Sequence, residues 1–187
     1  MQIDERIIAG MRDQLAVRDE LLRTGERQLG WKVGFGAPAA LEKLGTDRPL
    51  VGFLLESAVI GDGASVAIGG WTAPALEPEI AVHLAEDVPA GASWEQVRAA
   101  IGGLSAAIEL ADVSPPPEDP RAILAGNIFQ RHVMLGPVDE SRSTAERIGG
   151  RVVVDGAEHS ANDDPASITG EVVEVVRLTG ELLEAVG

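Results

Sequence analysis

Cysteine is absent from this chain of 187 residues. That absence excludes disulfide bonds, thiolate nucleophiles and zinc sites built from cysteine. Basic residues are also scarce: 15 Lys and Arg stand against 30 Asp and Glu, which gives a formal net charge of −15. A field of that sign repels phosphates and anionic lipids, so nucleic acid and membrane surfaces are not expected partners. The acidity alone indicates a well-solvated surface and proves no metal site.

No apolar run approaches the length that spans a bilayer, and the N-terminal region lacks the hydrophobic stretch of a secretory signal. The sequence also lacks a glycine-rich phosphate loop, the strand–helix alternation of nucleotide-binding sheets and a serine nucleophile elbow. Apolar residues make up 45% of the chain, which is enough for a hydrophobic core. We therefore expect one folded, cytoplasmic domain over residues 1–187.

Hydrophobic patterning predicts an α+β fold for this domain. An apolar stripe at helical spacing marks an N-terminal helical segment over residues 1–30, which Gly30 is expected to close; residues 31–187 form a β-rich core. Helices are expected to open near Pro38, Ser93, Asp119 and Asp164. Strands are expected at 31–36, 51–55, 65–68, 77–84, 104–110 and 129–135, and a hairpin turning at Asp155-Gly156.

Two acidic side chains share one face of an expected strand. With a period of two, Glu77, Glu79 and His83 point to one side, whereas Leu76 and Pro78 point to the other. Neighbouring carboxylates repel and are costly to desolvate, and a hard divalent cation with oxygen ligands removes both problems. The alternative is an edge strand with two solvated acids, with which Pro78 is compatible.

Glu109 is the one charged residue in an otherwise interior run, Ala106 to Ala111. A buried, unpaired Glu is costly, so it needs a nearby cation or a proton, unless its strand turns it toward water. Convergence of Glu77, Glu79 and Glu109 on one cation accounts for all three positions.

Lys32 is the fourth candidate, because Gly34 and Gly36 leave room on its face for a small anionic ligand; the alternative is a solvated surface lysine. Asp47 is either an acid/base residue or an ordinary turn residue. His83 is either an outer partner of the metal ligands or a hydrogen-bonded structural histidine.

These residues, in this order, resemble the 2-keto-4-pentenoate (2-hydroxypentadienoate) hydratase and 4-oxalocrotonate decarboxylase branch of the fumarylacetoacetate hydrolase superfamily. The specific part is the Glu77-Pro78-Glu79 pair with a distant third acid, Glu109. The likeness also covers the N-terminal helix, residues 30–34, 44–52, 76–81 and 107–109, and Asn127. It implies a mixed β-sheet or β-roll core with an N-terminal helix and peripheral helices. Relatives continue into further strands, so the expected core lacks its last strands.

The resemblance further implies that Glu77, Glu79 and Glu109 hold Mg²⁺ or Mn²⁺, which the 2-oxo and carboxylate groups of a substrate chelate. Lys32 then positions the substrate or acts as an acid/base residue, Asn127 binds substrate, and Asp47 belongs to a catalytic loop that covers the site.

The expected function is that of a metal-dependent lyase, a hydratase of 2-hydroxypenta-2,4-dienoate-type 2-oxo acids in aromatic-compound catabolism. Two alternatives use the same chemistry: decarboxylation of an oxo-diacid and C–C hydrolysis of an acylpyruvate. A third alternative is a truncated non-catalytic chain or a supporting subunit. The resemblance also implies a homo-oligomer, with a related decarboxylase as a further candidate partner.

Overall fold

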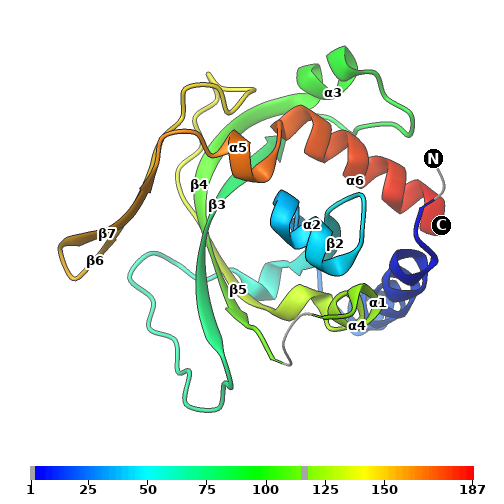
Figure 1. The fold of residues 1–187 in the computed structure, drawn as a ribbon, viewed down its shortest axis with the longest axis horizontal. Helices are drawn as coiled ribbons and strands as arrows, with labels where there is room; N and C mark the ends of the chain where they lie inside the picture. Colours follow the sequence, from blue (N-terminus) through cyan, green and yellow to red (C-terminus); the bar gives the residue numbers. More distant parts are fainter. Residues whose placement is uncertain (1–2, 115–117) are drawn as a thin grey trace.

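The computed structural model describes residues 3–114 and 118–187 and has a mixed α+β architecture (Figure 1). In chain order its elements are α1 (Glu5–Arg23), β1 (Gln28–Gly34), α2 (Pro38–Leu44), β2 (Leu50–Leu55), the 3₁₀ turn η1 (Glu56–Ala58), β3 (Pro74–Leu84), α3 (Trp94–Ala100), β4 (Ile101–Asp112), α4 (Pro120–Ala125), the 3₁₀ turn η2 (Asn127–Phe129), β5 (Gln130–Leu135), β6 (Gly150–Val154), β7 (Ala157–Asn162), α5 (Ala166–Thr169) and α6 (Val172–Val186). The α+β class expected from the sequence is therefore confirmed.

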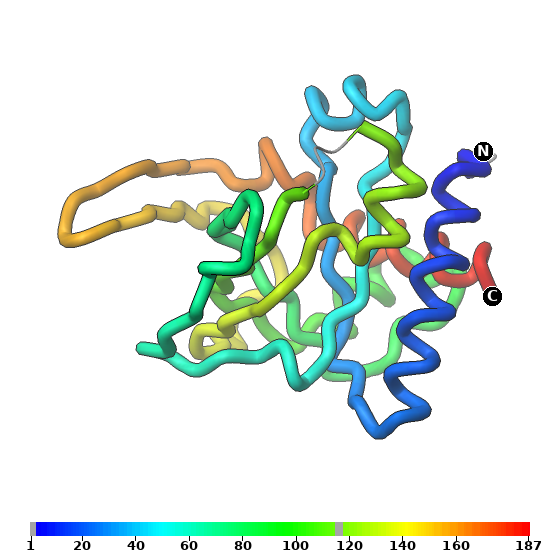
Figure 2. Tube along the Cα trace, turned by 90° about the horizontal axis from the view of Figure 1, so that it is seen from below, coloured from blue at the N-terminus to red at the C-terminus, as the bar shows by residue number. Residues whose placement is uncertain are grey.

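Within residues 3–114 and 118–187, the pairs of named strands are antiparallel and form three groups: β1–β2, β3–β4–β5 and β6–β7. The two longest strands, β3 and β4, run together as a curved ribbon through the molecule, and β1, β2 and most helices lie on one side of it (Figure 1). The β6–β7 hairpin projects away from the rest of the chain in both ribbon and tube views (Figures 1 and 2).

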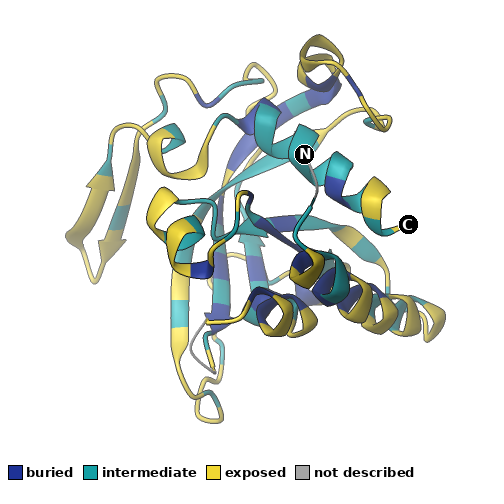
Figure 3. Cartoon of the chain, turned by 45° about the vertical axis from the view of Figure 1, so that its right-hand side comes forward, coloured by how far each residue is buried: buried dark blue, intermediate teal, exposed yellow. Residues whose placement is uncertain are grey.

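Two clusters of buried side chains form the core, and α6 contributes to both. The first cluster joins α1, α2, β2 and α4 through residues such as Met11, Leu50 and Leu124, and includes Leu182 of α6. The second joins α3 and β4 to the beginning of α6, where Val172 and Val173 are buried. Figure 3 shows the buried residues gathered between the strands and the helices, whereas the β6–β7 hairpin is largely exposed.

Local chemistry explains several helix ends. The Asp4 side chain accepts a hydrogen bond from the Arg6 N–H and caps α1, and Ser93 with Gln96 forms a complete capping box on α3. Gly45 ends α2 in the left-handed conformation. The Asp155-Gly156 hairpin is also confirmed, with φ of 51° and 79° at these two residues, as a tight hairpin turn requires.

Some boundaries differ from the sequence expectations. The helix expected within residues 1–30 ends at Arg23, and Gly30 lies inside β1. The strand expected at 65–68 is wrong: this stretch is irregular and Ile68 is 48% exposed, because no partner strand satisfies its backbone. The helix expected from Asp164 is divided at Gly170, whose φ of 79° and ψ of 175° interrupt the helix between α5 and α6.

Among residues 3–114 and 118–187, none of the helices has both the length and the apolar character that a membrane crossing requires.

Candidate metal centre

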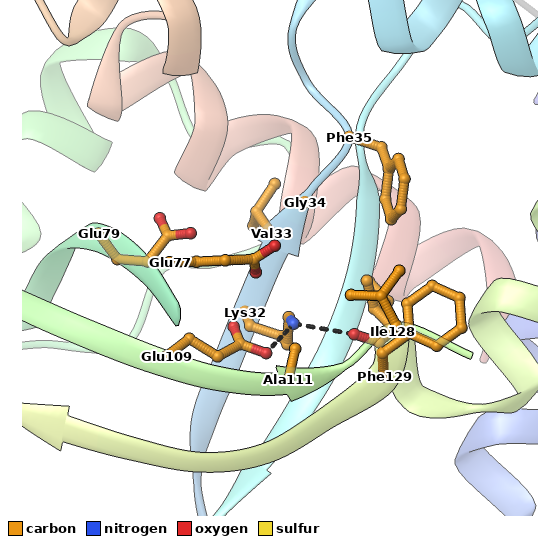
Figure 4. Close-up of a pocket in the computed structure, with 11 residues that line it drawn as sticks. Lys32, Val33, Gly34, Phe35, Glu77, Glu79, Glu109, Ala111, Ile128 and Phe129 are labelled. Atoms are coloured by element: carbon orange, nitrogen blue, oxygen red, sulfur yellow. Dashed lines mark hydrogen bonds and ion pairs between the residues drawn. The ribbon is translucent and has the colours of Figure 1, made fainter. Parts of the chain in front are cut away.

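The pairing of β3 with β4 brings three acids to one face of the sheet. Glu77 lies directly opposite Glu109 in the antiparallel register, and Glu79 lies two residues further along β3, opposite Ala107. One carboxylate oxygen from each of the three acids lies within 4.8 Å of the others. No other group of three His, Cys, Asp or Glu side chains approaches this closely in the described part of the chain. Figure 4 shows the three carboxylates beside Lys32.

The acids point inward, although β3 is the edge strand of its sheet. Glu77 and Glu79 are half-buried and Glu109 is only 4% exposed, whereas the neighbouring Leu76 is 57% exposed on the other face. A strand with solvated acids would show the opposite arrangement, because apolar side chains normally take the covered face. The reversal indicates that the inward face is shaped for polar chemistry rather than for packing.

Lys32 reaches the acids from β1. Its ammonium is buried and donates hydrogen bonds to Glu109 Oε1 and, at 3.1 Å, to the backbone carbonyl of Ile128 (Figure 4). The surface-lysine alternative is therefore wrong. Glu109 does have a cation nearby, as a buried carboxylate requires, and that cation is the Lys32 ammonium.

The charges of the cluster do not balance. Burial, followed by the negative charges of Glu109 and Glu77, raises the pKa of Glu79 to about 7, and Lys32 offsets only part of this rise. Burial also raises the pKa of Glu109, although Lys32 acts in the opposite direction. Three carboxylates facing one ammonium leave excess negative charge in a partly desolvated space. A hard divalent cation with oxygen ligands fits this donor set.

A cavity of about 290 Å³ opens beside the acids. Its polar side consists of the three acids and Lys32. Its remaining lining is mostly apolar and comprises Val33, Gly34, Phe35, Ala111, Val113, Ile128 and Phe129. Gly34 thus provides the room that the sequence suggested, whereas Gly36 is not among the lining residues. A small ligand with one charged end and one hydrocarbon end matches these two sides.

Several residues with a strained backbone lie at or beside this cavity. Phe35 has a φ of 59°, and Asn127, Ile128 and Phe129 follow one another with φ of 51°, 50° and 63°. Left-handed conformations cost about 1–2 kcal/mol for each residue with a Cβ, and more for a β-branched side chain such as Ile. Such strain tends to collect at functional sites.

Asn127 and Asp47 occupy places other than the cavity lining. The Asn127 amide exchanges two hydrogen bonds with the backbone of Phe53 in β2. Asp47 is exposed, lies 3.3 Å from Arg48 Nε and does not line the cavity. The roles expected for both residues stay predictions. His83 bonds to Ser105 at 2.9 Å, which agrees with the structural alternative for this histidine.

The sequence reasoning missed the wall opposite the acids. The Ile128 carbonyl is a backbone group, and no side-chain pattern identifies it. Gly52 offered the one available signal, because a glycine inside a strand often marks a close approach of neighbouring groups.

No family model matches the sequence, but curated proteins and solved structures are similar to it. A segment of 98 residues is 35% identical to the 2-keto-4-pentenoate hydratase of Burkholderia vietnamiensis (strain G4 / LMG 22486), and the match covers 51% of this chain and 37% of the relative. A segment of 66 residues is 36% identical to the 2-keto-4-pentenoate hydratase of Paraburkholderia phymatum (strain DSM 17167 / CIP 108236 / LMG 21445 / STM815), with 35% of this chain and 25% of the relative covered. The matches therefore span well under half the length of these curated relatives.

The fold is similar to that of 4-oxalocrotonate decarboxylase from Pseudomonas putida G7. Its structure with magnesium and adipate aligns with a TM-score of 0.82 at 24% identity, over 93% of this chain and 68% of that one. Its structure with calcium and acetate aligns with a TM-score of 0.80 at 25% identity, over 93% and 67%. The chain is therefore similar, in part of its sequence and in its fold, to 2-keto-4-pentenoate hydratases and to 4-oxalocrotonate decarboxylase, which is the branch of the fumarylacetoacetate hydrolase superfamily that its residues resemble.

Proposed function

We propose that this chain carries the divalent-metal site of a lyase that hydrates 2-hydroxypenta-2,4-dienoate-type 2-oxo acids. The observation that supports the proposal most is the cluster of Glu77, Glu79 and Glu109 beside a buried lysine and a small cavity. The hydratase names of the two curated relatives favour hydration over the other reactions of the branch.

In this proposal the three acids hold Mg²⁺ or Mn²⁺. The bound ion supplies Lewis-acid polarisation of the substrate's 2-oxo group and charge compensation for the acids. Magnesium or calcium in the decarboxylase structures supports a divalent cation in relatives with this fold. Burial and the neighbouring acids raise the pKa of Glu79 to about 7, so this residue is partly protonated near neutral pH, and it would have to be deprotonated to serve as a ligand.

The other residues of the cavity bind and orient the substrate. Lys32 donates a hydrogen bond from its ammonium to a substrate oxygen, and its position beside Glu109 places it at the charged end of the cavity. Phe35, Ile128 and Phe129 form apolar walls that accommodate the carbon chain of the substrate. Lys32 Nζ contacts Glu109 directly and is therefore also the proposed proton donor or acceptor.

Decarboxylation of an oxo-diacid is the second candidate, because the fold aligns with 4-oxalocrotonate decarboxylase over 93% of this chain. C–C hydrolysis of an acylpyruvate is the third. Closure of the strands into a β-roll, the homo-oligomer, the complex with a related decarboxylase and the role in aromatic-compound catabolism are finer parts of the proposal. A chain that only supports a partner enzyme is the alternative of another class.

Calorimetric titration with Mn²⁺ tests the site without a choice of substrate. The chain is expected to bind one ion, and Glu109→Gln is expected to lose affinity on the order of 100-fold, since even outer partners of metal ligands contribute 10- to 100-fold. Glu42→Gln is the matched control, because it removes the same charge from an exposed position on α2. Equal affinity in the parent and both variants contradicts the proposed site.

The reaction is then assigned by products. With Mg²⁺, hydration removes the conjugated absorbance of 2-hydroxypenta-2,4-dienoate, decarboxylation releases CO₂ from an oxo-diacid, and hydrolysis of an acylpyruvate releases pyruvate. Metal binding without turnover of any of the three substrates favours the non-catalytic alternative.

A further inference from the structure

Lys32 contacts the cavity wall opposite the acids through its hydrogen bond to the Ile128 carbonyl of η2. We propose that Asn127 is a positioning residue: it latches the left-handed turn of η2 to β2, and this turn holds the Lys32 ammonium on the Ile128 carbonyl so that Glu109 can bind a cation. The inference rests on the proposed metal site, but one of its tests does not involve metal.

The first observation is the conformation of the turn. Asn127, Ile128 and Phe129 all have φ between 50° and 63°, and Ile128 has the full left-handed geometry with ψ of 43°. A β-branched residue adopts this conformation only where its surroundings impose it. In this conformation the Ile128 carbonyl accepts a hydrogen bond of 3.1 Å from Lys32 Nζ (Figure 4).

The second observation is the latch. The Phe53 N–H donates to Asn127 Oδ1 at 2.8 Å, and Asn127 Nδ2 donates to the Phe53 carbonyl at 3.0 Å. Both polar atoms of the amide are therefore engaged by the β2 backbone, and Asn127 is not among the residues that line the cavity. An amide held in this way fixes the start of the turn rather than contacting a ligand.

The third observation is the space at Gly52. This residue pairs with Lys32 across β1 and β2. A Cβ at Gly52 would lie 2.9 Å from Asn127 Oδ1 and 3.0 Å from Lys32 Cγ. The latch and the lysine stem thus fill the space where a side chain would stand, so glycine is required there for both to keep their positions.

The effect on metal binding follows from the partners of Lys32. The ammonium is shared between a charged acceptor, Glu109, and a neutral one, the Ile128 carbonyl. A metal ion that takes Glu109 as a ligand competes with Lys32 for it. While the carbonyl holds the ammonium, Glu109 can turn to the ion at lower cost. If the turn is released, Glu109 becomes the main partner of Lys32, and Mn²⁺ has to displace a stronger ion pair.

Asn127→Gly tests the latch, because glycine still allows the positive φ but removes both hydrogen bonds. Mn²⁺ affinity measured by calorimetry is expected to fall about three- to tenfold, the factor that corresponds to one hydrogen bond. In a Lys32→Met background the same substitution is expected to leave Mn²⁺ affinity unchanged, since the competing ammonium is gone. This double-mutant cycle separates action through Lys32 from a general loss of structure.

Gly52→Ala offers an independent route to the same result. It is expected to weaken Mn²⁺ binding in the same direction as Asn127→Gly, since it pushes on both the latch and the lysine stem. Gly30→Ala is the matched control: Gly30 lies in β1 and is paired with Leu54 of β2, but a Cβ there meets nothing within 4 Å. Equal effects of the two alanines would overturn the role given to Gly52.

Two results of the cycle overturn the proposal. One is unchanged Mn²⁺ affinity in Asn127→Gly, and the other is an equal loss of affinity on Asn127→Gly with and without the Lys32→Met substitution. A raised KM with unchanged Mn²⁺ affinity makes Asn127 a substrate ligand instead.

If the parent binds no Mn²⁺, the proposed function fails, and urea unfolding of the metal-free proteins decides this inference. Coupled losses of stability for Asn127→Gly and Lys32→Met support it, and additive losses overturn it.

Discussion

One wall of the cavity is a regular antiparallel ladder, whereas the facing wall depends on a turn whose backbone is strained. On the β3–β4 side, Glu77 and Glu109 are brought together by a register that needs no unusual conformation. On the η2 side, three consecutive left-handed residues present one backbone carbonyl. The ladder brings charge into the cavity, and the turn directs the single ammonium that offsets part of it. Regular structure can thus gather ligands while strained structure orients their counter-ion.

The largest expected effect comes from removing the group that joins the two walls. Lys32→Met leaves Glu109 buried without its cation, and breaking a buried pair in this way costs about 3–5 kcal/mol. We expect the free energy of unfolding of the metal-free protein, measured with urea at pH 8 in EDTA, to fall by about that amount. Added Mn²⁺ should restore part of the loss. An unchanged free energy of unfolding would show that the ion pair between Lys32 and Glu109 does not stabilise the contact between the two cavity walls.

The pH dependence of stability is expected to come from the ladder side. The pKa of Glu79 is about 7 in the folded chain, against a reference value of 4.5. Between these values the folded state binds more protons than the unfolded state, so the free energy of unfolding falls as pH rises from about 4.5 to about 7 and then levels off. Glu79→Gln should remove this contribution. The check is urea unfolding of both metal-free proteins from pH 5 to pH 8.

The informative quantity is the difference between the two proteins, because other acids also titrate in this range. If the free energy of unfolding of the parent and of Glu79→Gln depended on pH in the same way, the folded chain would not hold an extra proton at Glu79.

The smallest effect is expected outside both walls. Asp47→Asn removes a charge that is exposed and paired only with its neighbour Arg48. Solvent screens such a charge, so Mn²⁺ affinity should change less than about twofold. A tenfold loss of Mn²⁺ affinity by calorimetry would indicate that the loop of Asp47 covers the cavity in solution, as the family resemblance implies.

Sequence reasoning was accurate where the determining chemistry is local. The capping box at Ser93, the left-handed stop at Gly45 and the Asp155-Gly156 turn each depend on residues within a few positions of one another. The same is true of Glu77 and Glu79, whose shared face follows from the two-residue period of a strand. These features could be predicted because neighbouring residues decide them.

Features that depend on distant partners were harder to predict. The direct opposition of Glu77 and Glu109 depends on the β3–β4 register, whereas the sequence predicted only that the three acids converge on one cation. The strand expected at 65–68 failed because no partner strand lies beside it. Lys32 and Ile128 are 96 positions apart, and the acceptor is a backbone carbonyl, so no residue type in the sequence predicts this contact.

Helix α6 has a consequence for how the chain unfolds. Its first turn is buried in one core cluster and Leu182, ten residues after Val172, is buried in the other. A helix transmits displacement along its axis, so neither cluster can loosen without pulling on the side chains of its neighbour. The two clusters should therefore melt in a single cooperative transition, and tryptophan fluorescence and far-UV circular dichroism should report the same midpoint.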